Sequence, residues 1–123
     1  MTVSIEIIGI PQLKKFLKKK TKQIDSGVDT GITKATIHVQ GEVKQSIAGR
    51  RAEIRSVDTG RFLNSVDFNV SKDQAIVFSL VPYAGILEFG ARGRAGRKHF
   101  NNTKDREQGK IREIIEKEID KKL

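Results

Sequence analysis

Cysteine is absent from this sequence of 123 residues, so disulfide bonds and thiolate metal sites are excluded. An intracellular protein is therefore the simpler expectation. The sequence also lacks the basic start and the apolar stretch of a signal peptide, and no apolar run approaches the length of a membrane span. Hydrophobic residues make up 37% of the chain and charged residues 32%, which is enough apolar material for one core. We expect residues 1–123 to form a single domain without membrane contact.

Patterns that carry catalysis or bind cofactors are also scarce. The serines lack the context of a nucleophile elbow, and the glycines at residues 90–93 lack the lysine of a phosphate-binding loop. The two histidines, His38 and His99, lie far apart, and we identify no carboxylate or second histidine at metal-ligand spacing from either. We therefore expect a protein that is not an enzyme, with no catalytic residue, no metal site and no cofactor.

The tetrapeptide Val-Asp-Thr-Gly occurs twice, at residues 28–31 and 57–60. Asp-Thr-Gly is the motif of aspartic proteases, in which two carboxylates about 3 Å apart share one proton. Here both copies follow polar residues, and their starts are only 29 positions apart, too close for two lobes. The first copy is predicted to lie within a helix and the second to form a structural turn.

Hydrophobic periodicity predicts the first two elements. Residues 2–8 alternate apolar and polar side chains, as a half-buried strand does. Apolar pairs then recur about every 11 residues, which keeps them on one side of a nearly straight helix. The pattern predicts one amphipathic helix over residues 11–47.

Three glycines, Gly27, Gly31 and Gly41, oppose a continuous helix, because each costs about 1 kcal/mol relative to alanine. A break near residues 25–31, with Asp29 capping a second helix, is therefore the alternative.

The middle of the chain has the pattern of a β-hairpin. Residues 49–57 are predicted to form an exposed loop. Asp58 and Thr59 then precede an apolar pair, which is typical of the N-cap of a short helix. Residues 66–70 and 75–81 are strand-like segments separated by turn residues, and together they predict the hairpin.

The last part of the chain is predicted to be mainly helical. Pro82 opens a short helical segment that Gly90 terminates, and residues 91–98 read as a flexible basic loop. From about Asn102, isoleucines at intervals of three and four predict a final helix. The expected class is α+β: a small antiparallel sheet, made of the N-terminal strand and the hairpin, packed by one long N-terminal helix and a C-terminal helix.

The formal net charge of +9 favours a polyanionic partner, either nucleic acid or an acidic protein surface. Two basic tracts are candidate contacts. The first consists of Lys14, Lys15, Lys18, Lys19 and Lys20, and the second of Arg92, Arg94, Arg97 and Lys98. A solvated helix face explains the lysine tract equally well. The second tract has no interleaved aromatic residue, so any DNA contact there is expected to involve phosphates without sequence specificity.

Two segments together resemble a known family. Val57-Asp58-Thr59-Gly60-Arg61-Phe62-Leu63-Asn64-Ser65-Val66 is similar to a D-T-G-R-L-x-x-S-I signature, and Tyr83-Ala84-Gly85-Ile86-Leu87-Glu88-Phe89-Gly90 to Y-A-x-x-x-E-F-G-T. In this order, with a hairpin between them, they resemble the tailed-phage neck or tail-completion proteins of the gene-product-ten family of phage HK-ninety-seven. Ala91 replaces the usual threonine, and Lys98-His99-Phe100 stands where an Arg-Pro-Phe-like stretch is usual.

The resemblance implies a structural virion protein that forms a homo-oligomeric ring at the head–tail junction. Its location would be the virion, and the host cytoplasm during assembly. Its partners would be copies of itself, neighbouring head-completion and tail proteins, and phage DNA through non-specific contacts. The signature residues with a structural role would be Asp58, Thr59, Gly60, Arg61, Ser65, Tyr83, Ala84, Glu88, Phe89 and Gly90.

Within the second signature, the resemblance implies that Tyr83, Leu87 and Phe89 pack the short helix and that Glu88 pairs with a basic neighbour. The alternative function is that of a small basic protein that binds nucleic acid without sequence specificity, for which the charge and the lysine tract are the motivation.

Overall fold

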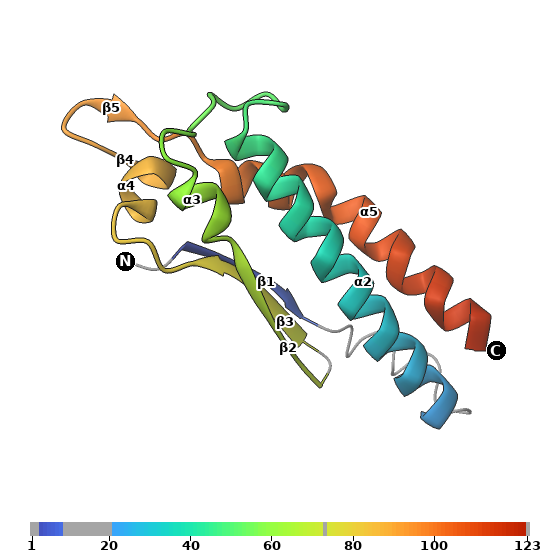
Figure 1. The fold of residues 1–123 in the computed structure, drawn as a ribbon. Helices are drawn as coiled ribbons and strands as arrows, with labels where there is room; N and C mark the ends of the chain where they lie inside the picture. The colour runs from blue at the N-terminus through green and yellow to red at the C-terminus, as the bar shows by residue number, and fades with distance from the viewer. Residues whose placement is uncertain (1–2, 9–20, 73, 123) are drawn as a thin grey trace.

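The computed structural model describes residues 3–8, 21–72 and 74–122 of the chain. Its elements, in chain order, are β1 (Val3–Ile8), α2 (Thr21–Ile47), α3 (Arg61–Asn64), β2 (Asp67–Ser71), β3 (Gln74–Ser79), α4 (Ala84–Phe89), β4 (Gly90–Ala91), β5 (Arg94–Ala95) and α5 (His99–Lys122). The long helices α2 and α5 lie side by side and pack against a small antiparallel sheet (Figure 1). The predicted α+β class is confirmed.

The three-stranded sheet has the order β1-β3-β2, and both pairs are antiparallel. The register places Ile5 opposite Val77 and Ile7 opposite Ala75, and all four side chains are buried. Because side chains alternate between the two faces of a strand, Glu6 lies on the other face, where it is exposed. The predicted N-terminal strand and the predicted hairpin are both confirmed.

Helix α2 is continuous from Thr21 to Ile47, so the alternative break near residues 25–31 is wrong. Its predicted beginning at residue 11 lies outside the described residues. An apolar side chain is buried at every third or fourth position along one side of the helix, as the periodicity predicts. These residues are Val28, Ile32, Ala35, Val39, Val43 and Ile47.

Two glycines of α2 lie against the backbone of α5. A Cβ atom at Gly27 would be 2.8 Å from Ile119 Cα, and one at Gly31 would be 2.8 Å from Ile115 Cα. Larger residues at these positions would push the two helices apart, because a Cβ cannot approach another backbone so closely. The first Val-Asp-Thr-Gly is part of a helix, as predicted, and its glycine permits close helix packing.

The segment before α5 differs from its predicted form. Residues 91–98 contain a short hairpin, in which β4 and β5 pair antiparallel, rather than only a flexible loop. Helix α5 begins at His99, earlier than the predicted start near Asn102. Gly90 ends α4, as predicted. Its φ of 85° favours glycine, and a Cβ there would overlap the carbonyl oxygen of Arg94.

The hydrophobic core lies between the sheet and the two long helices, and the short helix α3 contributes Phe62 to it. None of the helices in the described part of the chain has the length and the apolar character needed to cross a membrane.

Candidate functional site

The two signature segments meet in space although a hairpin separates them in the sequence. The buried ring of Phe62 in α3 contacts the ring of Tyr83, which precedes α4, with centroids 6.0 Å apart in an edge-on arrangement. The hydroxyl of Ser65 donates to the carbonyl of Phe62 and also lies 2.7 Å from the hydroxyl of Ser79 in β3. Both short helices are therefore attached to the end of the sheet.

The turn of the first signature depends on Gly60. This residue is the N-cap of α3 with a φ of 83°, in the left-handed region that glycine adopts at little cost. The prediction of a side-chain cap from Asp58 or Thr59 is wrong, because α3 has no side-chain cap hydrogen bond. Thr59 Oγ1 accepts only a long hydrogen bond, 3.4 Å, from the N–H of Arg61, and Asp58 is exposed.

The buried carboxylate of the second signature holds the start of α5. Glu88 is 1% exposed. Its Oε1 accepts from Phe100 N at 2.9 Å, and its Oε2 accepts from the backbone N and side-chain Nδ2 of Asn101, both at 2.8 Å. The two backbone donors are N–H groups at a helix N-terminus that have no partner within the helix, and a negative charge satisfies such groups well. The expected pairing of Glu88 with a basic neighbour is therefore wrong.

The other side chains of the second signature are divided between core and surface. Ala84 is fully buried and Leu87 packs against the core. Phe89 is 55% exposed, Ile86 is 58% exposed and Tyr83 is 36% exposed. The expectation that Phe89 packs the short helix is wrong, because it lies on the outer side of α4.

A buried chain of polar residues lies beneath the two signatures. Ser46 at the end of α2 donates to Glu53 Oε1 at 2.5 Å, and its oxygen lies 2.7 Å from His99 Nδ1. The other ring nitrogen of His99, Nε2, lies 2.7 Å from Ser56 Oγ. Because Ser46 gives its hydroxyl proton to Glu53, the neutral ring fits the tautomer in which Nδ1–H donates to Ser46. Nε2 can then accept from Ser56, whose hydroxyl also lies 3.1 Å from the carbonyl of Ile54. Glu53 and Ser56 belong to the segment 49–57, which is predicted to form an exposed loop; Glu53 is instead buried and Ser56 partly buried.

An arginine completes this chain at Glu53. Arg106 donates from Nη2 to Oε1 and from Nη1 to Oε2, both at 3.1 Å, and Asn102 Nδ2 donates to Oε2 at 3.3 Å. Burial by itself would raise the pKa of Glu53, but hydrogen bonds, chiefly those from Arg106 and Ser46, outweigh it and lower the pKa. Glu53 is therefore a buried, paired carboxylate that connects the end of α2 to α5.

The electrostatic state of His99 decides what this chain can do. Burial lowers its pKa to about 4, against an opposing effect of the Glu53 carboxylate. A serine beside a histidine is also the arrangement of an activated nucleophile. However, a base with this pKa is poorly matched to neutral pH, and Ser56 Oγ already accepts from Arg97 Nη1 at 2.8 Å. This hydrogen-bonded chain of polar side chains is suited to stabilising the fold rather than to transferring protons.

A hollow of about 420 Å³ lies next to these polar residues, since Ser56 is part of its lining, and we call it the arginine pocket. It is lined by Arg55, Ser56, Val57, Asp58, Thr59, Arg61, Phe62, Tyr83, Leu87 and Arg97. Asp58, Thr59, Arg61 and Tyr83 are residues of the two signatures. Sequence reasoning singled out Arg97 only as part of a loop, and Arg55 not at all. Arg55 and Arg61 lie close together in the sequence, but no local pattern indicates that Arg97 shares a hollow with them.

The structure separates the basic residues that the sequence singled out. Lys14, Lys15, Lys18, Lys19 and Lys20 lie outside the described residues. Arg92, Arg94 and Lys98 are exposed on or next to the β4–β5 hairpin, whereas Arg97 is half-buried in the arginine pocket. Its Nη1 also donates to the carbonyl of Arg55 at 3.2 Å.

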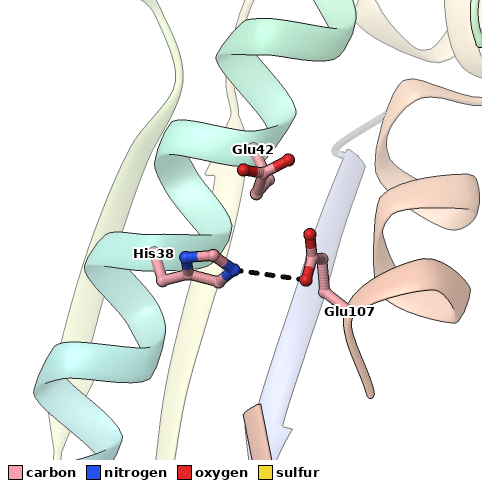
Figure 2. Close-up of side chains that lie close together, drawn as sticks. All are labelled: His38, Glu42 and Glu107. Carbon is pink, nitrogen blue, oxygen red and sulfur yellow. Dashed lines mark hydrogen bonds and ion pairs between the residues drawn. The ribbon is translucent and has the colours of Figure 1, made fainter. Parts of the chain in front are cut away.

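Between the long helices, His38, Glu42 and Glu107 lie with potential ligand atoms within 4.8 Å of one another (Figure 2). The interpretation that no carboxylate has metal-ligand spacing with a histidine is therefore wrong, since Glu42 follows His38 by one helical turn. His38 Nε2 lies 3.2 Å from Glu107 Oε2. Arg51 binds both oxygens of Glu42, at 2.7 and 2.9 Å, and this hydrogen bonding lowers the pKa of Glu42. The group is accounted for as polar packing between α2 and α5.

Comparison of the chain with protein-family models, with curated proteins and with solved structures found no match.

Proposed function

We propose that the protein is a structural subunit of the neck of a tailed phage or prophage, which forms a ring at the head–tail junction. The observation that carries the proposal is the joining of the two signature segments. Phe62 of the first contacts Tyr83 of the second, and Glu88 attaches the pair to α5. The packing of the two segments into one structural unit gives a physical reason for both signatures to occur together in one family.

The exposed apolar residues around α4 favour a role in assembly. Leu80, Ile86 and Phe89 are between 55% and 69% exposed, and all three lie on or just before α4. A monomer leaves such exposed apolar side chains in water, whereas a subunit that contacts neighbours can bury them. The proposed role also needs no catalysis, in keeping with a His99 pKa of about 4.

The test is the mass of the purified protein by light scattering at near-physiological salt, with electron microscopy of the same fractions. A ring with a central hole is the expected result. If subunits close into a ring only on a capsid template, adding capsids that lack the protein should produce the ring at their unique vertex. A chain that stays monomeric and does not join such capsids contradicts the proposal.

A second candidate, binding to nucleic acid without sequence specificity, is favoured by the β4–β5 hairpin. Arg92 and Arg94 are exposed there, and neither has an ion pair within the described segments. If this candidate holds, the monomer should bind duplex DNA with an affinity that falls steeply with salt, and Arg92→Gln with Arg94→Gln should reduce the salt dependence. A DNA-independent ring would favour the neck proposal instead.

A further inference from the structure

The arginine pocket carries an excess of positive charge that the described part of the chain leaves unpaired. Three arginines, Arg55, Arg61 and Arg97, line it, and Asp58 is the single acidic residue among the described residues that line it. Within the described segments none of the three arginines forms an ion pair with a carboxylate. Positive charges gathered around one hollow repel one another, and a bound anion would relieve this repulsion, so the pocket is suited to a negatively charged group.

One of these arginines is held in place by the buried chain below. Arg97 donates from Nη1 to Ser56 Oγ at 2.8 Å and to the Arg55 carbonyl at 3.2 Å. Ser56 in turn contacts His99, which is fully buried and is anchored through Ser46. A guanidinium that is already fixed loses little conformational entropy when it binds, which favours a carboxylate or phosphate in a defined geometry.

Part of the pocket lining, which we call the apolar wall, consists of Phe62, Tyr83 and Leu87. Leu87 belongs to α4, where Ile86 and Phe89 are exposed. A hollow of about 420 Å³ admits one or two side chains. A DNA duplex presents a charged convex backbone and gains nothing from the apolar wall, whereas a peptide can place a carboxylate on the arginines and an apolar side chain beside them.

We propose that the arginine pocket binds a carboxylate-bearing segment of a protein partner, with an apolar side chain of the same segment lying against Tyr83 and α4. The identity of that partner as a neighbouring subunit of the neck rests on the proposed function. The preference of the pocket for an acidic and apolar peptide rests only on its arginines and its apolar wall.

The test is a fluorescence anisotropy titration of the full chain with a short labelled peptide that alternates glutamate and leucine, and with its glutamine counterpart. We expect binding of the glutamate peptide only. Arg55→Gln with Arg61→Gln should weaken it by about tenfold or more, because two charged hydrogen-bond donors are lost. Both side chains are exposed, and neither holds the fold through an ion pair within the described residues. The matched control, Arg50→Gln with Lys117→Gln, removes two exposed charges outside the pocket and should leave binding unchanged.

Equal binding of the glutamate and glutamine peptides would overturn the pocket proposal, and so would an equal loss of peptide affinity in the control variant. The proposal also fails if the wild-type protein binds no peptide and the pocket variant has an unchanged assembly state. Binding of a DNA duplex, but not of the peptide, that depends on Arg61 would assign the pocket to nucleic acid instead. If wild-type rings already fill the pocket with a neighbouring subunit, the peptide is excluded, and the pocket variant should fail to form rings while the control variant forms them.

The failure of the neck proposal is distinguishable from the failure of this one. A chain that never forms rings and still binds the glutamate peptide through Arg55 and Arg61 keeps the pocket and loses only its neck partner. The opposite outcome is a wild-type protein that forms rings and does not bind the peptide, together with an Arg55→Gln, Arg61→Gln variant that assembles normally. That result would support the neck function and contradict the pocket proposal.

Discussion

Gly31 of α2 lies directly against Ile115 of α5, so that a Cβ atom on Gly31 would be only 2.8 Å from Ile115 Cα. Gly31→Ala should therefore lower the free energy of unfolding by about 1–3 kcal/mol, because the added methyl group separates two packed helices. Urea-induced unfolding followed by circular dichroism measures the change.

The matched control is Gly41→Ala, in the same helix. A Cβ at Gly41 meets no atom within 4 Å, so alanine should raise stability by up to about 1 kcal/mol through its better helix propensity. Equal effects of the two substitutions would contradict the close contact between α2 and α5.

Glu88→Gln should destabilise the protein by about 1–3 kcal/mol, since the amide keeps the shape of the side chain but removes the charge that three N–H donors of Phe100 and Asn101 share. Amide hydrogen exchange should speed up most at the start of α5. Glu113→Gln removes an equal charge at an exposed position of α5 and should change stability little. Equal losses in the two variants would contradict the capping role.

His99 should make stability depend on pH between about 7 and 4. Its pKa is about 4 in the folded protein and near the ordinary 6.5 in the unfolded chain, so acidification protonates the unfolded state first. Stability should fall as the pH drops through this window, by about 2 kcal/mol between pH 7 and 4.5, and stay level above pH 7.

Chemical unfolding at a series of pH values tests this dependence. His99→Gln should lose most of the slope, although its overall stability will be lower. His38→Gln, at a partly exposed position between the helices, should retain the slope. Carboxylates with lowered pKa values, such as Glu53, contribute mainly below pH 4.5 and do not account for the effect.

Arg106→Leu should destabilise the fold by about 2–3 kcal/mol, because it leaves the carboxylate of Glu53 buried without its charged partner. The effect should lie below that for a fully buried pair, since the Arg106 side chain is 33% exposed. Arg112→Leu breaks an exposed pair with Glu116 on the same helix and should cost under about 1 kcal/mol. Thermal unfolding compares the two, and similar losses would contradict the burial of Glu53.

The order and type of the main elements could be predicted because each leaves a periodic pattern of its own. The alternation in β1 and the long stripe in α2 are local, and helix and strand hydrogen bonds follow from them. The start of α5 was harder to predict, because the side chain that caps it, Glu88, comes from a different helix. The spacing of Gly27 and Gly31 by four residues was a usable signal of close helix contact. Helix propensity by itself indicates only that each glycine destabilises the helix.

The polar interior could not be predicted in the same way. Ser46, Glu53 and His99 have polar side chains, and burial of such groups depends on partners that are distant in the sequence. The segment around Glu53 therefore reads as an exposed loop until α5 supplies Arg106.

The sequence by itself determined the α+β class, the hairpin, the helical position of the first Val-Asp-Thr-Gly and the turn glycines, because these depend on local periodicity and backbone conformation. Only the tertiary structure decided which polar groups are buried and that Arg55, Arg61 and Arg97 line one pocket. The physical reason is that contacts such as that between Arg97 and Arg55 join residues 42 positions apart, and such contacts arise from packing rather than from any local pattern.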